Sequence, residues 1–471
     1  MFFQRIDDRQ LAQAGYLIGC QATGEALVID PNRDVDQYVA AAAAERLRIT
    51  HVTETHIHAD FVSGARELAK RTGATLLLSG EGGRDWQYAF GAEAAATILK
   101  DGDSWMVGRL RIDVVHTPGH TPEHLMLILT DLPASNHPIM AFTGDFVFVG
   151  DVGRPDLLEK AAGQANTMAA GARELWRSIA RFRALPDYVQ VWPGHGAGSA
   201  CGKALGAVPA TTVGYEKLVN WGVAAPDEDT FVKMVLDGQP DPPAYFARMK
   251  RVNRDGPPPL REATALSRLT TDELSALQRQ SATLIDIRPA RAFAAGHVRG
   301  AISVPFNRSF TKYAGSVVSP DAPVVFITDD RGTVAADAAR ALLLIGVESA
   351  TGFIPHSAAD AGALEPLERV ETGEAIRRHA AGAALVDVRD RFEWESGHVP
   401  AARHVPLAEL VARADELPRD TPVLVYCQTG SRSAIAASVL RTLGVDAHDA
   451  GGMVAWRRSG GPIETAAPAA V

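Results

Sequence analysis

Short apolar runs rich in β-branched residues alternate with helical patterns along the first half of the chain. The predicted strands cover residues 26–30, 49–55, 110–115, 139–142 and 188–192. The predicted helices cover residues 35–46, 62–70, 197–219 and 230–249. Because strand and helix keep alternating over this length, the pattern predicts an α/β domain that ends near residue 250.

The second half of the chain contains an internal repeat. Residues 255–259 read Asp-Gly-Pro-Pro-Pro and interrupt the helical pattern, so we place a linker at about residues 250–262. Beyond it, Leu284-Ile285-Asp286-Ile287-Arg288 returns 101 residues later as Leu385-Val386-Asp387-Val388-Arg389. Each copy alternates short apolar runs with helices, which predicts a parallel sheet covered on both faces. We therefore predict three domains, over residues 1–250, 263–362 and 366–471.

Composition and charge exclude several classes of protein. The 471 residues carry a formal net charge of -9, which gives no electrostatic footprint for nucleic acid or for an anionic membrane. No apolar run reaches the roughly 18 residues of a membrane span. The three cysteines, Cys20, Cys201 and Cys427, are too few for a disulfide framework. We therefore expect a cytoplasmic protein without nucleic-acid or membrane partners, and we expect it to form a homo-oligomer.

Four predicted strands of the first domain end in residues that can bind a metal. These residues are His56, His58 and Asp60 after strand 49–55, His120 after 110–115, Asp145 after 139–142, and His195 after 188–192. A histidine-rich surface loop would explain one such turn, but here ligand types recur at four strand ends. Imidazole and carboxylate bind first-row metals, and strand-end loops are where a rigid scaffold presents chemistry. The sequence therefore predicts a metal site.

These motifs resemble a known fold. His56-x-His58-x-Asp60, Pro-Gly-His120, Thr-Gly-Asp145 and Pro-Gly-His195 resemble, in order and spacing, the motifs of the metallo-β-lactamase fold. The resemblance covers about residues 1–250 and implies an αββα sandwich with the metal at its edge. The family motif usually continues with a histidine that binds a second metal, but this chain has Phe61 there. Because a phenyl ring cannot coordinate a metal, we expect a mononuclear site.

The persulfide dioxygenases of this fold bind one iron(II) with two histidines and an aspartate. Carried over by motif, the resemblance implies that His56, His120 and Asp145 bind one iron(II) per chain, which is the ligand set of non-haem iron oxygenases. The residues around these ligands would then orient them or hold water. They are His58, Asp60 and His195, whereas Phe61 beside them would help to exclude a second ion and bulk water.

An arginine beyond the third ligand is a candidate for substrate binding. Arg154 lies nine residues after Asp145 and resembles an arginine that the family uses near the substrate. Its guanidinium would suit a carboxylate of glutathione or a related thiol, and a structural salt bridge is the alternative. The tyrosine that some glutathione-using members carry after the last motif histidine is absent, because Gly196-Ala197-Gly198 stands there. The sequence therefore leaves the carrier thiol open.

The second copy of the repeat contains a candidate nucleophile. The apolar strand at residues 423–426 runs directly into Cys427, and a helical pattern follows to Leu443. Backbone N–H groups and the positive helix end would surround the sulfur and favour the nucleophilic thiolate. The loop resembles that of the rhodanese sulfurtransferases, over about residues 370–465. The resemblance implies a persulfide on Cys427, positive charge from Arg432, and substrate binding by Gln428, Thr429, Gly430 and Ser431.

The first copy of the repeat lacks this chemistry. At the corresponding strand end, residues 326–332 read Phe-Ile-Thr-Asp-Asp-Arg-Gly, and the whole copy contains no cysteine. Aspartates would repel the anions that such a loop attracts. We therefore expect residues 263–362 to form a rhodanese-like domain without catalytic activity, used for packing and spacing.

The two resemblances together imply a sulfide-oxidising enzyme. A persulfide dioxygenase oxidises the outer sulfur of a thiol persulfide to sulfite, and a rhodanese moves outer sulfur atoms between thiols and sulfite. The expected reaction uses O2 and a low-molecular-weight thiol persulfide at iron(II), and Cys427 passes sulfur to sulfite to give thiosulfate. The direction of sulfur flow is not fixed by the sequence. The alternatives are a zinc-dependent thioester hydrolase of the glyoxalase II type fused to a sulfurtransferase, and a non-oxidative sulfur carrier.

Overall fold

The computed structural model describes residues 1–157, 167–260, 266–359, 362 and 364–465. These residues fall into two compact units. The first comprises Met1–Arg261 with Leu344–Gly346, and the second comprises the remainder of the chain. None of the helices in the described ranges combines the length and the apolar composition that a membrane crossing requires.

The first unit contains two six-stranded sheets. The first sheet has the order β1 (Phe2–Asp8), β2 (Gln13–Cys20), β3 (Glu25–Ile29), β4 (Arg48–Thr53), β5 (Thr75–Ser79) and β6 (Thr97–Leu99). The second sheet has the order β12 (Thr211–Thr212), β11 (Gln190–Pro193), β10 (Met140–Gly144), β9 (Leu125–Asp131), β8 (Leu110–His116) and β7 (Ser104–Val107). In the first sheet the pairs from β3 to β6 are parallel, so the ends of β4 and β5 lie at one edge.

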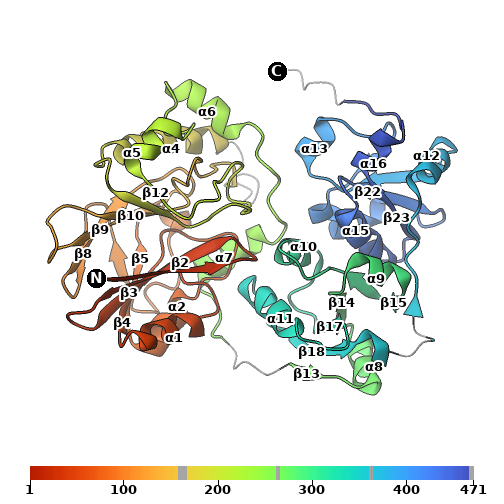
Figure 1. Cartoon of the computed structure of the whole chain (residues 1–471), viewed down its shortest axis with the longest axis horizontal. Helices are drawn as coiled ribbons and strands as arrows, with labels where there is room; N and C mark the ends of the chain where they lie inside the picture. The colour runs from red at the N-terminus through yellow and green to blue at the C-terminus, as the bar shows by residue number, and fades with distance from the viewer. Residues whose placement is uncertain (158–166, 261–265, 360–361, 363, 466–471) are drawn as a thin grey trace. The chain divides into compact units, whose positions relative to one another are not determined.

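The two sheets pack face to face, and helices cover their outer faces (Figure 1). Along β8, Leu110, Ile112 and Val114 are buried between the sheets while the residues between them are partly exposed, as expected for a half-buried strand. The helices over the first sheet are α1 (Asp36–Ala44) and α2 (Ala65–Thr72). Those over the second are α4 (Met168–Arg183), α5 (Val213–Val219) and α6 (Glu228–Leu236), and α7 (Phe246–Asp255) and the short η1 (Arg84–Trp86) complete the unit. The predicted αββα sandwich is confirmed.

Two long helices predicted at the end of this unit are wrong. The segment 197–219 is helical only from Val213, because the Asp151 carboxylate accepts hydrogen bonds from the backbone N–H groups of Lys203 and Ala204 and fixes a loop there. The segment 230–249 is interrupted after Leu236 by a stretch that contains Gly238 and three prolines, and α7 begins only at Phe246. The hydrogen bonds between Asp151 and the backbone N–H groups of Lys203 and Ala204 could not be predicted from the helical pattern of the segment itself.

The second unit contains two parallel sheets. One has the order β13 (Ser267–Arg268), β18 (Ala350–Pro355), β17 (Val324–Thr328), β14 (Thr283–Asp286) and β16 (Ala301–Ser303). The other has the order β21 (Arg403–His404), β20 (Ala384–Asp387), β22 (Val423–Cys427) and β23 (Ala447–Gly452). A small antiparallel pair joins β15 (His297–Val298) and β19 (Leu364–Glu365). The predicted parallel sheets are confirmed.

Helices flank both sheets of this unit (Figure 1). Those of the first copy are α8 (Thr271–Arg279), α9 (Ala290–Ala295), α10 (Phe310–Val317), α11 (Ala335–Leu344) and η2 (His356–Ala358). Those of the second copy are α12 (Thr372–Ala380), α13 (Arg391–Glu395), η4 (Leu407–Glu409), α14 (Leu410–Arg413), η5 (Ala414–Glu416), α15 (Ser431–Thr442) and α16 (Met453–Arg458).

The repeated Asp-x-Arg motif has the same structural role in both copies. Arg288 pairs with Asp286 at 2.6 Å and donates to the carbonyl of Gly296, and Arg389 pairs with Asp387 at 2.7 Å and donates to that of Gly397. The motif therefore ties the end of a central strand to the helix that follows it. Residues 261 and 262 of the predicted linker lie outside the described part of the chain, and the predicted domain boundaries stay predictions.

Candidate metal centre and sulfur-transfer loop

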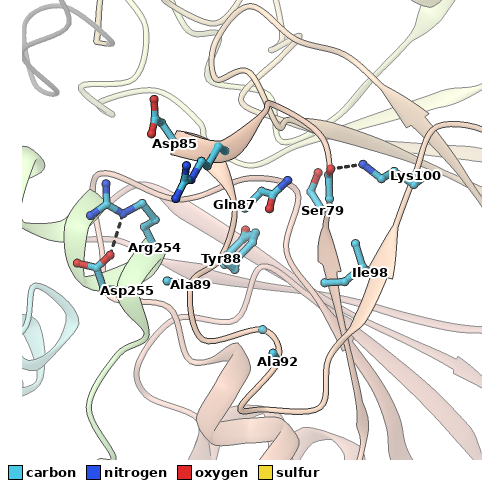
Figure 2. Close-up of a pocket in the computed structure, with 13 residues that line it drawn as sticks. Ser79, Asp85, Gln87, Tyr88, Ala89, Ala92, Ile98, Lys100, Arg254 and Asp255 are labelled. Atoms are coloured by element: carbon cyan, nitrogen blue, oxygen red, sulfur yellow. Dashed lines mark hydrogen bonds and ion pairs between the residues drawn. The ribbon is translucent and has the colours of Figure 1, made fainter.

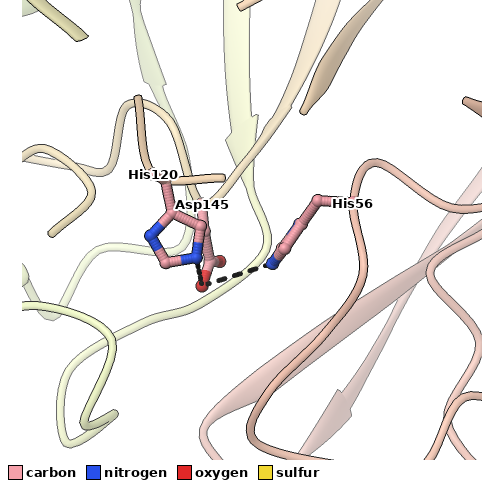
Figure 3. Close-up of side chains that lie close together, drawn as sticks. All are labelled: His56, His120 and Asp145. Atoms are coloured by element: carbon pink, nitrogen blue, oxygen red, sulfur yellow. Dashed lines mark ion pairs between the residues drawn. The ribbon is translucent and has the colours of Figure 1, made fainter. Parts of the chain in front are cut away.

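His56, His120 and Asp145 come together at the edge of the sandwich (Figure 3). His56 follows β4, His120 lies between β8 and β9, and Asp145 follows β10. One ligand atom of each lies within 4.8 Å of the others, and all three side chains are buried. The Oδ2 atom of Asp145 is 3.9 Å from His56 Nε2 and 3.7 Å from His120 Nε2. The structure thus brings together the three residues that the resemblance implied as ligands.

Glycines let these loops approach one another. Gly119, which precedes His120, has a φ of 139°, and a Cβ atom there would lie 2.5 Å from Leu175 in α4. Gly144, which precedes Asp145, has a φ of 49°, and a Cβ atom there would lie 2.5 Å from the Thr55 hydroxyl. A larger residue would therefore displace the His120 loop from α4 or the Asp145 loop from Thr55.

The hydrogen bonds of the two histidines leave their Nε2 atoms directed at Asp145. The Thr55 hydroxyl donates to Asp30 at 2.9 Å and therefore accepts from His56 Nδ1 at 3.0 Å. His120 Nδ1 donates to the carbonyl of Arg154 at 3.0 Å. Both Nε2 atoms consequently carry a lone pair, which is what a metal ligand requires.

The charge states of the three residues suit a metal. Burial, with the neighbouring His58, keeps the pKa of His56 well below its ordinary value, and burial also lowers the pKa of His120. Although burial acts to raise it, the His195 imidazole keeps the pKa of Asp145 well below its ordinary value. Within the described residues, Oδ2 of Asp145 accepts no hydrogen bond. Two neutral imidazoles and a buried carboxylate oxygen without a donor form a set that fits a divalent metal.

His195 and Asp60 lie behind the Asp145 carboxylate. His195 Nδ1 is 2.6 Å from Asp145 Oδ1, and its Nε2 is 2.7 Å from Asp60 Oδ2. Burial acts to lower the pKa of His195, but the negative charge of Asp145 raises this pKa well above its ordinary value. His195 is therefore a buried cation between two carboxylates, and it fixes which oxygen of Asp145 faces the histidines.

His58 and Phe61 form another wall of the site. His58 Nε2 is 3.2 Å from Asp30 Oδ1, and this charge raises the pKa of His58 to about 9 against the effect of burial. The ring of Phe61 is fully buried, and its centroid is 4.4 Å from that of His58. An apolar ring thus occupies the position of the motif's second-metal histidine.

Several residues of this centre were missed in the sequence. Asp30 anchors Thr55 and His58, and His124, four residues after His120, accepts the Asp145 backbone N–H at 3.2 Å. Because His124 lies so close to the motif histidine His120 in the sequence, its place near the metal site could have been predicted. Cys201 lies with Asp60 and His195 in a second group whose ligand atoms are within 4.8 Å of one another. Cys201 and Asp60 are far apart in the sequence, so the sequence did not predict that they lie close together. Both ring nitrogens of His195 in that group already contact carboxylates.

Arg154 has the structural salt bridge that the sequence left as an alternative. Its guanidinium is fully buried and binds both oxygens of Asp156, at 2.8 and 2.7 Å. It also donates to the carbonyls of Ala200 and Pro240. Since its own carbonyl accepts from His120, the arginine positions a candidate metal ligand, and substrate binding by its guanidinium stays an untested prediction.

Replacing Arg154 by alanine is expected to destabilise the first domain by about 3–5 kcal/mol, because the buried Asp156 carboxylate loses its guanidinium partner. Urea unfolding of Arg154→Ala beside the exposed-arginine control Arg109→Ala measures this loss. A variant of unchanged stability whose KM for persulfide rises would instead show that the guanidinium binds substrate.

The Cys427 loop has the predicted strand, loop and helix arrangement. Cys427 ends β22, Gly430 with a φ of 107° precedes α15, and the Gly430 N–H donates to Cys427 Sγ at 3.1 Å. Gln428 accepts from Arg389 at 3.2 Å, whereas Thr429 and Ser431 contact each other. The backbone thus directs an N–H group at the sulfur, as an anion-stabilising loop requires.

The guanidinium of Arg432 is paired within the same domain. It binds both carboxylate oxygens of Glu393 in α13, at 2.6 and 2.8 Å, and lies 3.6 Å from Asp390. Although burial acts to lower it, this pairing raises the pKa of Arg432. Its positive charge is therefore partly compensated before any anion binds.

The corresponding loop of the first copy is closed by its own aspartate. Oδ1 of Asp329 accepts from the backbone N–H groups of Arg331 and Gly332, both at 3.1 Å, and Thr328 donates to the Asp329 carbonyl. The carboxylate thus occupies N–H groups that an anionic ligand would need.

Replacing Thr328 and Asp329 together by alanine is expected to leave oxygen uptake and thiosulfate formation largely intact while lowering stability, because the loop N–H groups lose their acceptor. Both activities and the thermal midpoint of the variant are measured beside wild type. A specific loss of sulfur transfer at unchanged stability would show that this domain takes part in the chemistry.

The described linings of two cavities contain none of the candidate metal ligands. The cavity of about 650 Å³ in Figure 2 is bordered by Tyr88, Lys100 and the ion pair Arg254–Asp255, and no predicted site residue is among its described lining. A cavity of about 610 Å³ borders the Cys427 loop at Thr429, and Arg369 and Arg458 line it together with one carboxylate residue, Glu371. The second cavity could therefore admit an anion next to the loop.

Sequence profiles and solved structures identify the family. The profile of the metallo-beta-lactamase superfamily matches residues 9–195, and that of the rhodanese-like domain matches residues 270–354 and 371–459. The crystal structure of a metallo-beta-lactamase from Staphylococcus aureus subsp. aureus COL is 39% identical, with a TM-score of 0.67, and the match covers 75% of this chain and 99% of the other. The chain belongs to the metallo-beta-lactamase superfamily. Two rhodanese-like domains follow its metallo-beta-lactamase domain.

The curated relatives of this metallo-beta-lactamase domain include different enzymes. A hydroxyacylglutathione hydrolase from Rhodospirillum rubrum is 32% identical over 181 residues, which are 38% of this chain and 60% of the relative. The mitochondrial persulfide dioxygenase of Bos taurus is 30% identical over 184 residues, which are 38% of this chain and 62% of the relative. The chain thus spans less than two thirds of the length of these relatives.

Proposed function

We propose that the chain is a persulfide dioxygenase that uses one iron(II) and is coupled to a rhodanese-type sulfurtransferase. The observation that carries this proposal is the set of three converging ligand atoms, from His56, His120 and Asp145, beside a buried phenyl ring. Two histidines and one carboxylate with open positions are typical of non-haem iron(II) oxygenases. Similarity to a persulfide dioxygenase supports the choice of substrate.

The protein supplies a rigid and selective setting for this iron. Iron(II), when bound, would offer open positions for O2 and the terminal sulfur of the persulfide and would supply the electrons that activate O2. His195 fixes the orientation of Asp145, so one carboxylate oxygen remains directed at the metal position. Phe61 restricts a second ion and bulk water, because its ring fills the neighbouring position.

The overall reaction consumes one persulfide, one O2 and one water and releases one thiol, one sulfite and two protons. Cys427, as a thiolate, would attack the outer sulfur of a second persulfide, so that its S–S bond breaks, the carrier thiol leaves and a persulfide forms on Cys427. Sulfite would then take this outer sulfur, which gives thiosulfate and returns the Cys427 thiolate. The Gly430 N–H bonds to Cys427 Sγ, which supports an anion there, and Arg369 and Arg458 in the adjacent cavity suit the charge of sulfite.

The second candidate is a zinc-dependent thioester hydrolase, which the similarity to a hydroxyacylglutathione hydrolase supports. Its usual two-metal site would need a ligand at position 61, where this chain has a buried phenyl ring. A non-oxidative sulfur carrier would not need the three converging ligand atoms of His56, His120 and Asp145.

Oxygen consumption distinguishes these functions. Iron-loaded protein is mixed with glutathione persulfide in an oxygen electrode, and in parallel with a glutathione thioester. We expect oxygen uptake with the persulfide, with sulfite and thiosulfate as products, and slow thioester hydrolysis. Thioester hydrolysis without oxygen uptake would favour the hydrolase, and sulfur transfer without oxygen uptake would favour the carrier.

A further inference from the structure

The hydroxyl of Ser433 lies between the candidate nucleophile and a buried carboxylate. Ser433 Oγ is 3.7 Å from Cys427 Sγ and 2.6 Å from Asp449 Oδ1. Ser433 belongs to the first turn of α15 and Asp449 to β23, the strand next to β22. All three side chains are buried, so water cannot replace these contacts freely.

The Ser433 hydroxyl has one proton and is surrounded by acceptors. Besides Asp449 and the sulfur, the carbonyls of Gly430 and Gly451 lie 3.1 and 3.0 Å away. The distance of 2.6 Å to Asp449 is typical of a hydroxyl that donates to an ionised carboxylate. With its proton directed at Asp449, Ser433 can only accept from Cys427, which suits a protonated thiol.

The opposite direction of the same chain suits a thiolate. If the Asp449 carboxyl is protonated, it donates to Ser433, and the Ser433 proton is free to point at the sulfur. Burial raises the pKa of Asp449, whereas the hydrogen bonds from Ser433 and from the Gly451 N–H act to lower it. Burial therefore favours the neutral form of Asp449 that this direction of the chain requires.

We propose that Cys427 and Asp449 share one proton through Ser433, so that this buried chain carries one negative charge, either on the carboxylate or on the sulfur. Asp449 and Ser433 are then positioning residues for the nucleophile. Two interacting groups of this kind titrate as a pair rather than independently.

The proton balance of the exchange is simple. The S–H bond of Cys427 breaks as a new O–H bond forms on Ser433, and the original Ser433 O–H bond breaks as an O–H bond forms on Asp449 Oδ1. A neutral thiol and a carboxylate thus become a thiolate and a neutral carboxyl, and no proton enters or leaves the protein. The thiolate is generated at the site without a general base in solution.

Other charged groups face this chain and set the background against which it titrates. Arg369 Nε, before α12, is 3.9 Å from Asp449 Oδ2. Arg432 is paired with Glu393 and Asp390, and Arg389 with Asp387. Tyr313 in α10 interacts electrostatically with both Arg432 and Cys427, and burial raises its pKa. None of these groups lies between Ser433 and the two groups that it joins.

The proposal deepens the sulfurtransferase half of the proposed function and rests on Cys427 as its nucleophile. Alkylation by iodoacetamide tests it without any sulfur substrate, so a failure of sulfur transfer cannot be mistaken for a failure of the proton chain. The rate of Cys427 modification is followed against pH by mass spectrometry of the Cys427 peptide, which separates it from Cys20 and Cys201. The midpoint of this profile reports when the thiolate forms.

Four proteins are compared: wild type, Asp449→Asn, Ser433→Ala and the double variant. An asparagine amide donates permanently to Ser433 and mimics the neutral carboxyl, so Asp449→Asn is expected to lower the midpoint by about one pH unit or more. With Ser433→Ala the bridge is missing, and the same change at position 449 is expected to move the midpoint by less than about 0.3 pH unit. Equal shifts in both backgrounds would show that Asp449 acts by charge alone and would overturn the proposal.

Ser438 supplies the matched control for a buried serine. It lies five residues further along α15, where its hydroxyl donates to the carbonyl of Ile435. Ser438→Ala is expected to leave the pH profile unchanged, and a shift as large as that of Ser433→Ala would contradict a specific role for Ser433.

If the variants at 449 or 433 do not fold, wild-type protein still decides the question. Capping Cys427 with neutral iodoacetamide removes its charge, so Asp449 should ionise and the infrared absorption of a protonated carboxyl should disappear. An infrared difference spectrum without this loss, recorded where Cys427 is a thiolate, would overturn the shared proton.

Discussion

Replacing His56 by alanine is expected to abolish oxygen uptake with a thiol persulfide and to leave the protein with little bound iron. His56 supplies one of three converging ligand atoms, and its Nε2 faces the Asp145 oxygen that accepts no hydrogen bond in the described chain. Loss of a residue that merely orients a ligand typically costs 10–100-fold in metal affinity or activity, so loss of a ligand should cost roughly 100-fold or more. Iron content and oxygen uptake are measured on the same preparation.

His137 supplies the control for this variant. It is exposed in the turn between β9 and β10, and its imidazole belongs to neither group of candidate ligands. His137→Ala is therefore expected to retain both iron and oxygen uptake. A His56→Ala protein that binds iron and consumes oxygen as wild type does would show that the metal lies elsewhere.

Replacing Cys427 by serine is expected to leave oxygen uptake intact and to shift the product from thiosulfate to free sulfite. A serine hydroxyl is far less acidic than a thiol, so the loop would contain no nucleophilic anion to take up sulfur. The three candidate metal ligands belong to a different unit of the chain and are untouched. Chromatography of the products after thiol labelling measures the ratio of sulfite to thiosulfate.

Cys20 provides a matched exchange of thiol for hydroxyl. It is also buried, at the end of β2, and its sulfur accepts the Arg109 backbone N–H rather than lying in the loop. Cys20→Ser should still form thiosulfate. If Cys427→Ser keeps its iron but stops consuming oxygen, then the persulfide must be loaded on Cys427 before it is oxidised, and the assignment of Cys427 to the second step is wrong.

The αββα sandwich was predicted from the resemblance of the motifs, and the candidate ligands of these motifs follow strands in the structure. The runs before His56, His120 and Asp145 are strongly β-branched or apolar, and the run before Asp145 is buried along its whole length, as expected for a strand covered on both faces. Helix ends were predicted less well. The segment after Gly196 has helical composition, but its backbone N–H groups at Lys203 and Ala204 bond to Asp151, about 50 residues earlier. A pattern read within one window cannot contain such a contact.

The candidate ligands were predicted by motif, whereas the residues that fix their charge were predicted only in part. His195 and Asp60 were expected near the ligands, and the structure adds that His195 bridges two carboxylates. The contacts of Ser433 and Asp449 with the nucleophile were not predicted, because a serine or an aspartate at these positions does not by itself indicate a chemical role. Their relation to Cys427 appears only when β23 is placed beside β22.

The metal content of protein purified without oxygen tests the central claim most directly. The account predicts about one iron per chain, retained by wild type and lost with His56→Ala, together with oxygen uptake when a thiol persulfide is added. Two tightly bound zinc ions per chain, with thioester hydrolysis and no oxygen uptake, would contradict it.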